Sequence, residues 1–415
     1  MNALAALRKA CGDQAVREAT ERDAIDGVRP SYVAAPASTD ETADVLRAAA
    51  EHGLSVVVRG AGTRIDWGNP PRGADLVVST QRMSGLLEHA AGDLVVRVQP
   101  GLRLADLRDA LAPARQRLAI DETVPGATLG GTVATGTAGP IRMLYGSVRD
   151  LLIGVTVVRA DGTVARSGGK VVKNVAGYDL GKLYTGSYGT LGVITEAIFR
   201  LHPLPEARAL VTTRFADERA AAPVLAEVIG SRLVPTAVEV DRPAADAPLT
   251  VAVLLEGVRP GVVARAEAAS RMLGADAEVS RDLPDWWARY PFAGDATGLK
   301  LTVPIAVVPD LLRAVREAAA RTGLAVAVRG SAGVGALYAG VSPESAPATV
   351  ARFVATLRDF VARYGGSVVV LRAPTEVKSE VDVWGPVAGL DLMRRLKDQF
   401  DPEHRLAPGR FVGGI

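Results

Sequence analysis

The sequence is poor in the residues that most often bind metals. It has one cysteine, Cys11, and four histidines, His52, His89, His202 and His404, among 415 residues. A single thiol cannot build a disulfide, a thiolate zinc site or an iron–sulfur cluster by itself, so any such cluster must belong to a partner. Because the histidines are far apart in sequence, no short metal-binding motif is present. We therefore predict no metal site in this chain.

Two further features are missing, a long apolar run and an excess of one charge. Nowhere do eighteen apolar residues follow one another, and the N-terminal segment MNALAALRKACG lacks the apolar core of a signal peptide. Lys plus Arg number 48 and Asp plus Glu number 46, which leaves a net charge of +2. Such a balance argues against nucleic acid or an anionic membrane as the partner. We predict a cytoplasmic protein that has no membrane span and binds a small molecule.

Local signals predict two differently built regions, as expected for a chain longer than one hydrophobic core usually supports. Residues 38–41 have the form of a capping box, and they predict a helix over 39–51 that is followed by a strand over 54–59. Further short strands and a hairpin around Asp161 and Gly162 predict an α+β region up to about residue 205. From about residue 207, two sets of strands and helices predict an antiparallel sheet covered by helices on one face. Their predicted ranges are 209–214, 217–229, 237–240 and 249–256, then 298–304, 309–321, 324–329, 336–341, 342–364 and 367–371.

Three glycine-rich segments interrupt the first region. The first, Arg59-Gly60-Ala61-Gly62-Thr63, follows a predicted strand, but it is no Rossmann fingerprint, because Ile65 stands where a third glycine is required. The second, residues 125–139 (PGATLGGTVATGTAG), has no large side chain and is predicted to be neither core nor helix. Its backbone N–H groups and threonine hydroxyls can approach an anion closely, and its place between apolar strands favours a ligand over a flexible linker. The third, residues 187–192 (SYGTLG), fits a turn and a ligand site equally well.

Taken together, these segments make residues 28–205 resemble the FAD domain of the vanillyl-alcohol oxidase and p-cresol methylhydroxylase superfamily. The resemblance implies an α+β fold with a two-part FAD-binding domain and a ferredoxin-like α+β cap domain. It divides the chain into an N-terminal helical segment (1–27), the FAD-binding domain (28–205), the cap (206–380), and a helix and tail that return to the FAD domain (381–415).

The resemblance also implies a set of cofactor-binding residues, with the first turn holding the pyrophosphate. These residues are Arg59, Gly60, Ala61, Gly62, Thr63, Arg64, Pro125, Gly126, Thr128, Gly130, Gly131, Thr135, Gly139, Tyr145, Gly146, Ser147, Gly189, Gly192, Val193 and Ile194. Family members with covalent flavin usually place a histidine directly after the first turn, where this chain has Thr63. We therefore predict FAD that is bound without a covalent link.

The C-terminal part resembles the FAD-binding subunit of bacterial glycolate oxidases, through residues 381–386 (VDVWGP) and 400–415 (FDPEHRLAPGRFVGGI). In related flavoenzymes the Pro-Gly-Arg segment folds back to the flavin, so Arg410 either joins the cofactor or substrate contacts or only pins the tail. Catalytic relatives carry a segment G-H-x-G-D-G-N-L-H that binds a divalent metal, but residues 330–338 here read GSAGVGALY. Ser331 and Tyr338 stand in the histidine places. The remaining catalytic candidates are Arg329, Tyr338, Arg372, Glu376 and Lys378.

These features predict the FAD-binding subunit of a glycolate oxidase-like complex that dehydrogenates small 2-hydroxy acids. Its predicted partners are a second flavoprotein subunit and an iron–sulfur subunit. Two alternatives stay open: a self-sufficient, metal-independent FAD-linked hydroxy-acid dehydrogenase, and a scaffold that binds FAD only structurally.

Overall fold

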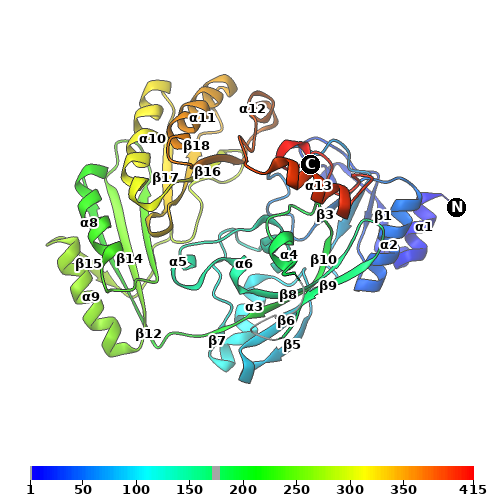
Figure 1. Ribbon diagram of the computed structural model, residues 1–415, viewed down its shortest axis with the longest axis horizontal. Coiled ribbons are helices and arrows are strands. Elements are labelled where there is room, and N and C mark those ends of the chain that lie inside the picture. Colours follow the sequence, from blue (N-terminus) through cyan, green and yellow to red (C-terminus); the bar gives the residue numbers. More distant parts are fainter. Residues whose placement is uncertain (1, 171–177) are drawn as a thin grey trace. The chain divides into compact units, whose positions relative to one another are not determined.

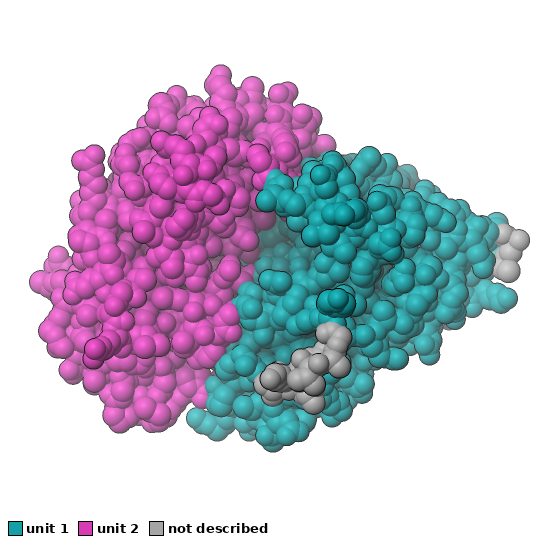
Figure 2. Space-filling model, viewed as in Figure 1, with its two compact units in different colours: residues 1–137, 147–203, 387–415 teal, residues 138–146, 204–386 magenta. Residues whose placement is uncertain are grey.

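The computed structural model describes residues 2–170 and 178–415, which form two compact units (Figure 2). Unit 1 consists of Met1–Thr137, Ser147–Pro203 and Val387–Ile415, and unit 2 of Ala138–Gly146 and Leu204–Pro386. The N-terminal residues thus share a unit with the following strands, and so does the C-terminal tail. Within the described ranges, no helix is both long and apolar enough to cross a bilayer.

The first part of unit 1 is a small, mostly parallel sheet with two helices (Figure 1). Its strand order is β1-β2-β4-β3, and β4 pairs in parallel with both β2 and β3. Ser38 caps α2 by accepting a hydrogen bond from the Glu41 N–H, so this helix covers the predicted residues. The elements are α1 (Ala3–Cys11), β1 (Val16–Glu18), β2 (Tyr32–Ala34), α2 (Thr39–Glu51), β3 (Val56–Arg59) and β4 (Leu76–Ser79).

The second part of unit 1 is an antiparallel sheet with the strand order β5-β6-β10-β8-β9. The predicted hairpin joins β8 to β9, and Gly162 supplies the positive φ of 78° that its turn requires. The elements of this part are β5 (Leu86–Ala90), β6 (Val95–Val98), α3 (Leu104–Leu111), β7 (Gln116–Arg117), α4 (Leu129–Thr135), α6 (Val148–Leu151), β8 (Leu152–Val158), β9 (Val164–Gly168), α7 (Gly181–Tyr184), β10 (Val193–Arg200), β11 (His202–Pro203) and α13 (Leu390–Phe400).

One local expectation is wrong, since the small-residue segment 125–139 contains the helix α4. The Thr128 side chain caps this helix by accepting from the Gly131 N–H, and Gly136 ends it in the left-handed conformation. The glycines serve close packing, because a Cβ on Gly130 would lie 2.5 Å from the Pro100 Cβ. Contacts with neighbouring segments therefore outweigh the low helix propensity of glycine and threonine.

Unit 2 is built from two consecutive βαββαβ repeats that share one eight-stranded antiparallel sheet. The sheet order is β15-β12-β14-β13-β17-β18-β16-β19, so each repeat has the ferredoxin-like order and the two join between β13 and β17. This confirms the ferredoxin-like cap. The first repeat comprises β12 (Ala207–Phe215), α8 (Glu218–Gly230), β13 (Ala237–Arg242), β14 (Leu249–Gly257), α9 (Arg259–Leu273) and β15 (Glu278–Ser280). The second comprises β16 (Thr297–Thr302), α10 (Val308–Thr322), β17 (Val326–Ser331), β18 (Ala336–Val341), α11 (Pro347–Ala362) and β19 (Ser367–Arg372), and unit 2 also holds α5 (Arg142–Tyr145) and α12 (Thr375–Glu380).

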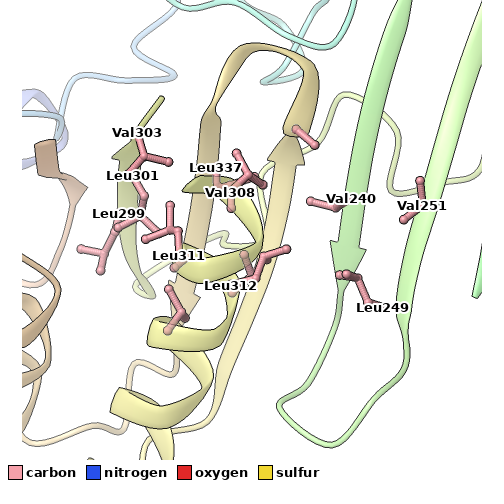
Figure 3. Close-up of a cluster of buried hydrophobic side chains, with 14 of the residues drawn as sticks. Val240, Leu249, Val251, Leu299, Leu301, Val303, Val308, Leu311, Leu312 and Leu337 are labelled. Carbon is pink, nitrogen blue, oxygen red and sulfur yellow. The ribbon is translucent and has the colours of Figure 1, made fainter. Parts of the chain in front are cut away.

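The core of unit 2 lies between this sheet and its helices (Figure 3). Alternate strand residues such as Val240, Leu299 and Leu337 point toward Leu311 and Leu312 of α10, and all of these side chains are buried. Because strand side chains alternate between faces, the residues between them project from the opposite face of the sheet. That second face carries the row of polar side chains described for unit 2 below.

Candidate functional site

Six segments of unit 1 line one cavity, which is partly open to solvent and measures about 770 Å³ when that open space is included. The end of β3 and the turn after it form one side, and Thr80 follows the neighbouring strand β4. Pro100, the helix α4, the turn 187–192 and Arg410 complete the lining.

The turn after β3 is shaped to bring backbone, rather than side chains, to the cavity. A Cβ on Gly60 would lie only 2.4 Å from the Thr128 Oγ1, and Gly62 has a positive φ of 79°. Neither position accepts a larger residue without strain, so the chain exposes peptide N–H groups here. Such groups are suited to an anionic ligand.

The charged side chains that line the cavity also favour an anionic ligand. Arg59, Arg64 and Arg410 line the cavity, and its described lining residues include no carboxylate. Asp23 lies behind Arg59 and accepts a hydrogen bond from its Nη2 at 2.9 Å. Hydrogen bonds from Arg17, from the Thr20 backbone and from Arg59 outweigh the effect of burial and hold the pKa of Asp23 well below its usual range. Asp23 is thus a fixed anion that orients one of the three cations.

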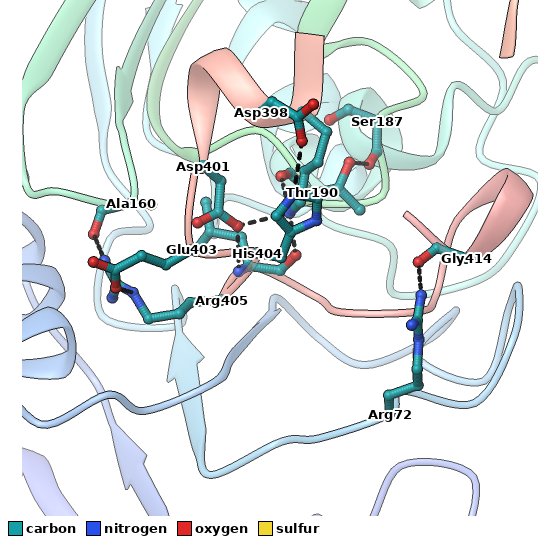
Figure 4. A network of polar contacts seen from close by, with 12 residues as sticks. Arg72, Ala160, Ser187, Thr190, Asp398, Asp401, Glu403, His404, Arg405 and Gly414 are labelled. Carbon is teal, nitrogen blue, oxygen red and sulfur yellow. Dashed lines mark hydrogen bonds and ion pairs between the residues drawn. The ribbon is translucent and has the colours of Figure 1, made fainter. Parts of the chain in front are cut away.

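The C-terminal tail completes the site by joining two of its turns. The Arg410 Nη2 donates to the carbonyl oxygens of Ile65 and Trp67 just beyond the first turn, and burial lowers the pKa of this arginine. Lys397 is fully buried and donates to the Thr190 carbonyl in the third turn at 2.8 Å and to Asp401 at 2.7 Å. Figure 4 shows Thr190 and Asp401 beside the tail. Arg410 therefore both pins the tail and lines the cavity.

The structure brings most of the predicted cofactor residues together. Those lining the cavity are Arg59, Gly60, Ala61, Gly62, Thr63, Arg64, Thr128, Gly130, Gly131, Thr135, Gly189, Gly192, Ile194 and Arg410. Those of unit 1 that are not among the lining residues are Pro125, Gly126, Ser147 and Val193, and Val193 is fully buried in β10. Gly139, Tyr145 and Gly146 belong to unit 2, so a role for them at the cofactor stays a prediction.

Several further lining residues were not predicted from the sequence: Val58, Ile65, Thr80, Pro100, Ala134, Ser187 and Tyr188. A signal existed for Thr80, because the carboxyl ends of adjacent parallel strands meet at one edge of a sheet and β4 ends at Ser79. Tyr188 lies within the third glycine-rich segment, residues 187–192, but only the glycines of that segment were predicted to bind the cofactor. No comparable signal marks Pro100, which is placed by its contact with Gly130.

A second polar arrangement lies on the face of the unit 2 sheet opposite the helices α8, α9, α10 and α11. Asp241 of β13 is opposite Arg329 of β17, Arg329 is opposite Tyr338 of β18, and Tyr338 is opposite Lys300 of β16. Directly opposed residues of antiparallel strands share a face, with Cβ atoms about 5 Å apart. The four side chains therefore form a row across four strands, which we call the polar row. The Tyr290 ring packs edge-on against Tyr338, with centroids 4.7 Å apart.

The structure separates the catalytic candidates. Arg329 donates to Asp241 at 2.7 Å and so belongs to an ion pair. Arg372 lies at the end of the outermost strand, β19. On α12, Glu376 is exposed and Lys378 is buried. Of these five residues, the polar row contains Arg329 and Tyr338.

The glycine-rich turn and the three arginines, in a cavity whose described lining residues include no acid, fit the pyrophosphate of a dinucleotide, so fold and site define a dinucleotide-binding protein. Residues 30–168 match the FAD binding domain family, and residues 296–370 and 381–411 match the C-terminal domain family of FAD linked oxidases. This chain belongs to the family of FAD-linked oxidases. It is an FAD-dependent oxidoreductase.

Similar proteins agree with this assignment. The chain is 28% identical to the glycolate oxidase subunit GlcD of Bacillus subtilis, over 92% of this chain and 88% of that protein. It is 30% identical to an uncharacterized FAD-linked oxidoreductase of Mycobacterium tuberculosis, over 93% and 91% of the two chains. A stretch of 154 residues is 40% identical to the glycolate oxidase subunit GlcE of Escherichia coli, over 37% of this chain and 43% of GlcE. Among solved structures, p-cresol methylhydroxylase matches with a TM-score of 0.77 and 16% identity over 98% of this chain and 96% of that chain, which confirms the predicted fold type.

Proposed function

We propose that this protein is an FAD-binding subunit of a glycolate oxidase-like complex that dehydrogenates small 2-hydroxy acids. The observation that carries the proposal is the arginine-rich cavity of unit 1 in a chain that resembles two glycolate oxidase subunits, GlcD and GlcE. FAD, when bound, supplies the acceptor for the hydride that leaves the substrate carbon. The residues of this chain then have to hold the cofactor and the substrate and to take up the hydroxyl proton.

The cavity supplies specific groups for the cofactor. The backbone of the first turn, together with Arg59 and Arg64, would hold the pyrophosphate, since arginine and peptide N–H groups match phosphate oxygens. The backbone around Gly189 and Gly192 would hold the nucleotide end. Neither a histidine nor a cysteine is among the described residues that line the cavity, which supports a dissociable cofactor.

The proposed partners are a second flavoprotein subunit and an iron–sulfur subunit. Electrons taken from the substrate must leave the reduced flavin, and this chain has one cysteine, Cys11, which is buried. In the part of the chain that the structure covers, no cluster of three or more His, Cys, Asp or Glu side chains could hold a metal ion. An iron–sulfur carrier would therefore come from another polypeptide.

The polar row favours a second candidate function, a dehydrogenase that oxidises its hydroxy acid without metal and without a second flavin subunit. Lys300 and Tyr338 offer groups that can bind or accept a proton on the cap sheet. The two candidates share the cofactor and the substrate class. They differ in whether the isolated chain can oxidise the hydroxy acid without partner subunits.

An anaerobic absorbance titration of the isolated, FAD-loaded chain with glycolate and D-lactate tests the proposal. Loss of the oxidised-flavin band without partners would support the self-sufficient dehydrogenase. Bleaching only after the partner subunits are added would support the subunit role. If neither acid bleaches the flavin even in the reconstituted complex, while dithionite does, the hydroxy-acid function is wrong. Release of flavin by acid precipitation checks the non-covalent link in the same sample.

A further inference from the structure

The helix α9 of unit 2 carries a line of exposed side chains along one flank. Arg259, Val263, Glu267 and Arg271 are spaced four residues apart, so they follow one another along the helix at intervals of about 6 Å. All four are exposed, whereas Val262 lies beside them and is buried against the sheet. We call this line the α9 ridge. Its apolar member, Val263, is 53% exposed, which leaves a branched hydrocarbon side chain in water in the middle of a helix.

The α9 ridge borders a hollow at the edge of the unit 2 sheet. Its four residues line this hollow together with Val279 and Ser280 of β15, which lies beside α9 (Figure 1). β15 is the outermost strand of the sheet and pairs with β12 on one side. All three residues of β15 are exposed. An open strand edge beside exposed apolar side chains is typical of a surface that contacts another protein.

The charges of the α9 ridge indicate which protein fits it. The only ion pair that Arg259 makes with the described residues is with Glu206 at 3.7 Å, an exposed pair that contributes little. Glu267 makes no hydrogen bond or ion pair within the described ranges. A surface of one charge sign would therefore meet a like charge on this ridge. A surface that carries both signs in the reverse order would match it.

A second copy of the ridge, turned antiparallel, has this reverse order. If Val263 lies against Val263 of the second copy, then Arg259 of each chain is opposite Glu267 of the other, because both are four residues from Val263. A shift by one turn toward the C-terminus would instead place Arg259 opposite Arg271. The charge pattern thus favours the register that is centred on Val263.

We propose that the α9 ridge is a contact between two copies of this chain, related by a two-fold axis at Val263. Such a contact requires a surface that is complementary to itself, and the order Arg259, Val263, Glu267 meets this requirement. A second helix lying along the hollow also removes the exposed Val279 from water. The contact lies wholly within unit 2 and is independent of the proposed substrate and of the proposed partner subunits.

Sedimentation velocity of the full-length, FAD-loaded chain, from about 1 to about 100 µM, tests the pairing of charges. We expect the wild type to dimerise. Arg259→Glu and Glu267→Arg should each weaken the dimer at least tenfold, since each substitution brings like charges together at two places. An equimolar mixture of these two variants should dimerise within about threefold of wild type, because every glutamate again faces an arginine. A wild type that stays monomeric, or a mixture no tighter than its components, would overturn the proposal.

Cross-linking tests the position of the two-fold axis. Val263→Cys places one accessible thiol of each copy at the axis, while the native Cys11 is buried. A short bismaleimide should therefore convert this variant into a covalent dimer. The matched control is Leu392→Cys on α13, where the native leucine is 54% exposed, and it should remain mostly monomeric. Circular dichroism checks that both variants are folded. Equal cross-linking of the two, or none with Val263→Cys in dimeric protein, would show that another surface joins the copies and overturn the proposal.

Discussion

A buried ion triad joins the two repeats of unit 2, and replacing its carboxylate should measurably destabilise the protein. Glu218 at the start of α8 lies 2.7 Å from Arg242 of β13 and 2.7 Å from Arg316 of α10. The carboxylate is 2% exposed. In Glu218→Gln the two guanidinium groups lose their counter-charge, while the shape of the side chain is kept.

The size of the effect follows from the pKa of the carboxyl group. Burial alone would raise it, but hydrogen bonds from Arg316 and Arg242 outweigh burial and lower the pKa of Glu218 from 4.5 to about 2. At about 1.4 kcal/mol for each tenfold change in the protonation equilibrium, the ionised triad contributes about 3 kcal/mol at pH 7. Removing one partner of other buried ion pairs costs about 3–5 kcal/mol, which is a similar size.

The pH dependence has a defined sign. A carboxyl group whose pKa is lowered on folding contributes its full stability above its unfolded value of 4.5, and loses it as the pH falls toward 2. The difference between wild type and Glu218→Gln should therefore be about 3 kcal/mol at pH 7 and less than half of that at about pH 3.

Urea unfolding followed by tryptophan fluorescence measures the difference, since three of the four tryptophans, Trp286, Trp287 and Trp384, lie in unit 2. The control is Glu317→Gln, whose carboxylate is 45% exposed and 3.8 Å from Arg313, and which should cost less than about 0.5 kcal/mol. If both variants unfold at the same urea concentration at pH 7, the triad contributes nothing and the reasoning is wrong.

Three further predictions concern the cofactor cavity. Gly60→Ala should raise the dissociation constant of FAD at least tenfold, because the new methyl meets the Thr128 hydroxyl; titration by flavin fluorescence checks this, and adding Thr128→Ala should recover part of the loss. Asp23→Asn should weaken FAD about tenfold by releasing Arg59, and an unchanged FAD titration would contradict the orienting role. Lys397→Met leaves the Asp401 carboxylate buried without its cation and should lower the free energy of unfolding of unit 1 by about 3–5 kcal/mol; a urea midpoint equal to wild type would show the pair to be dispensable.

Sequence signals predicted those parts of the fold that depend on neighbours in the chain. The capping box at Ser38 determines where α2 begins, and Asp161 and Gly162 form the hairpin turn. The helix α9 was missed because Pro260 and Gly261 stand in its first turn, where they lower the helix signal although proline fits that position. The helix α4 was missed for a related reason, since its residues favour a helix only once Pro100 and the third turn pack against it.

The residues of the candidate site that meet only across strands could not be predicted from the sequence. The turn after β3 could be found because its glycines are consecutive in sequence. Lys300 could not, since it becomes a neighbour of Tyr338 only through the register of β16 with β18. Its neighbours on β18 and β19, Tyr338 and Val369, are likewise set by the folded sheet, and no local pattern around residue 300 indicates them.

The hydrogen bonds from Arg410 to the carbonyls just beyond the first turn have a consequence for when the protein can bind FAD. Arg410 reaches the Ile65 carbonyl across 345 residues of chain, and the whole of unit 2 is synthesised in between. At about 5–20 residues per second, the first turn waits roughly 20 to 70 seconds before the tail that closes the cavity has been synthesised. Until then the cavity of the nascent chain lacks Arg410, so we expect FAD to bind after the polypeptide is finished.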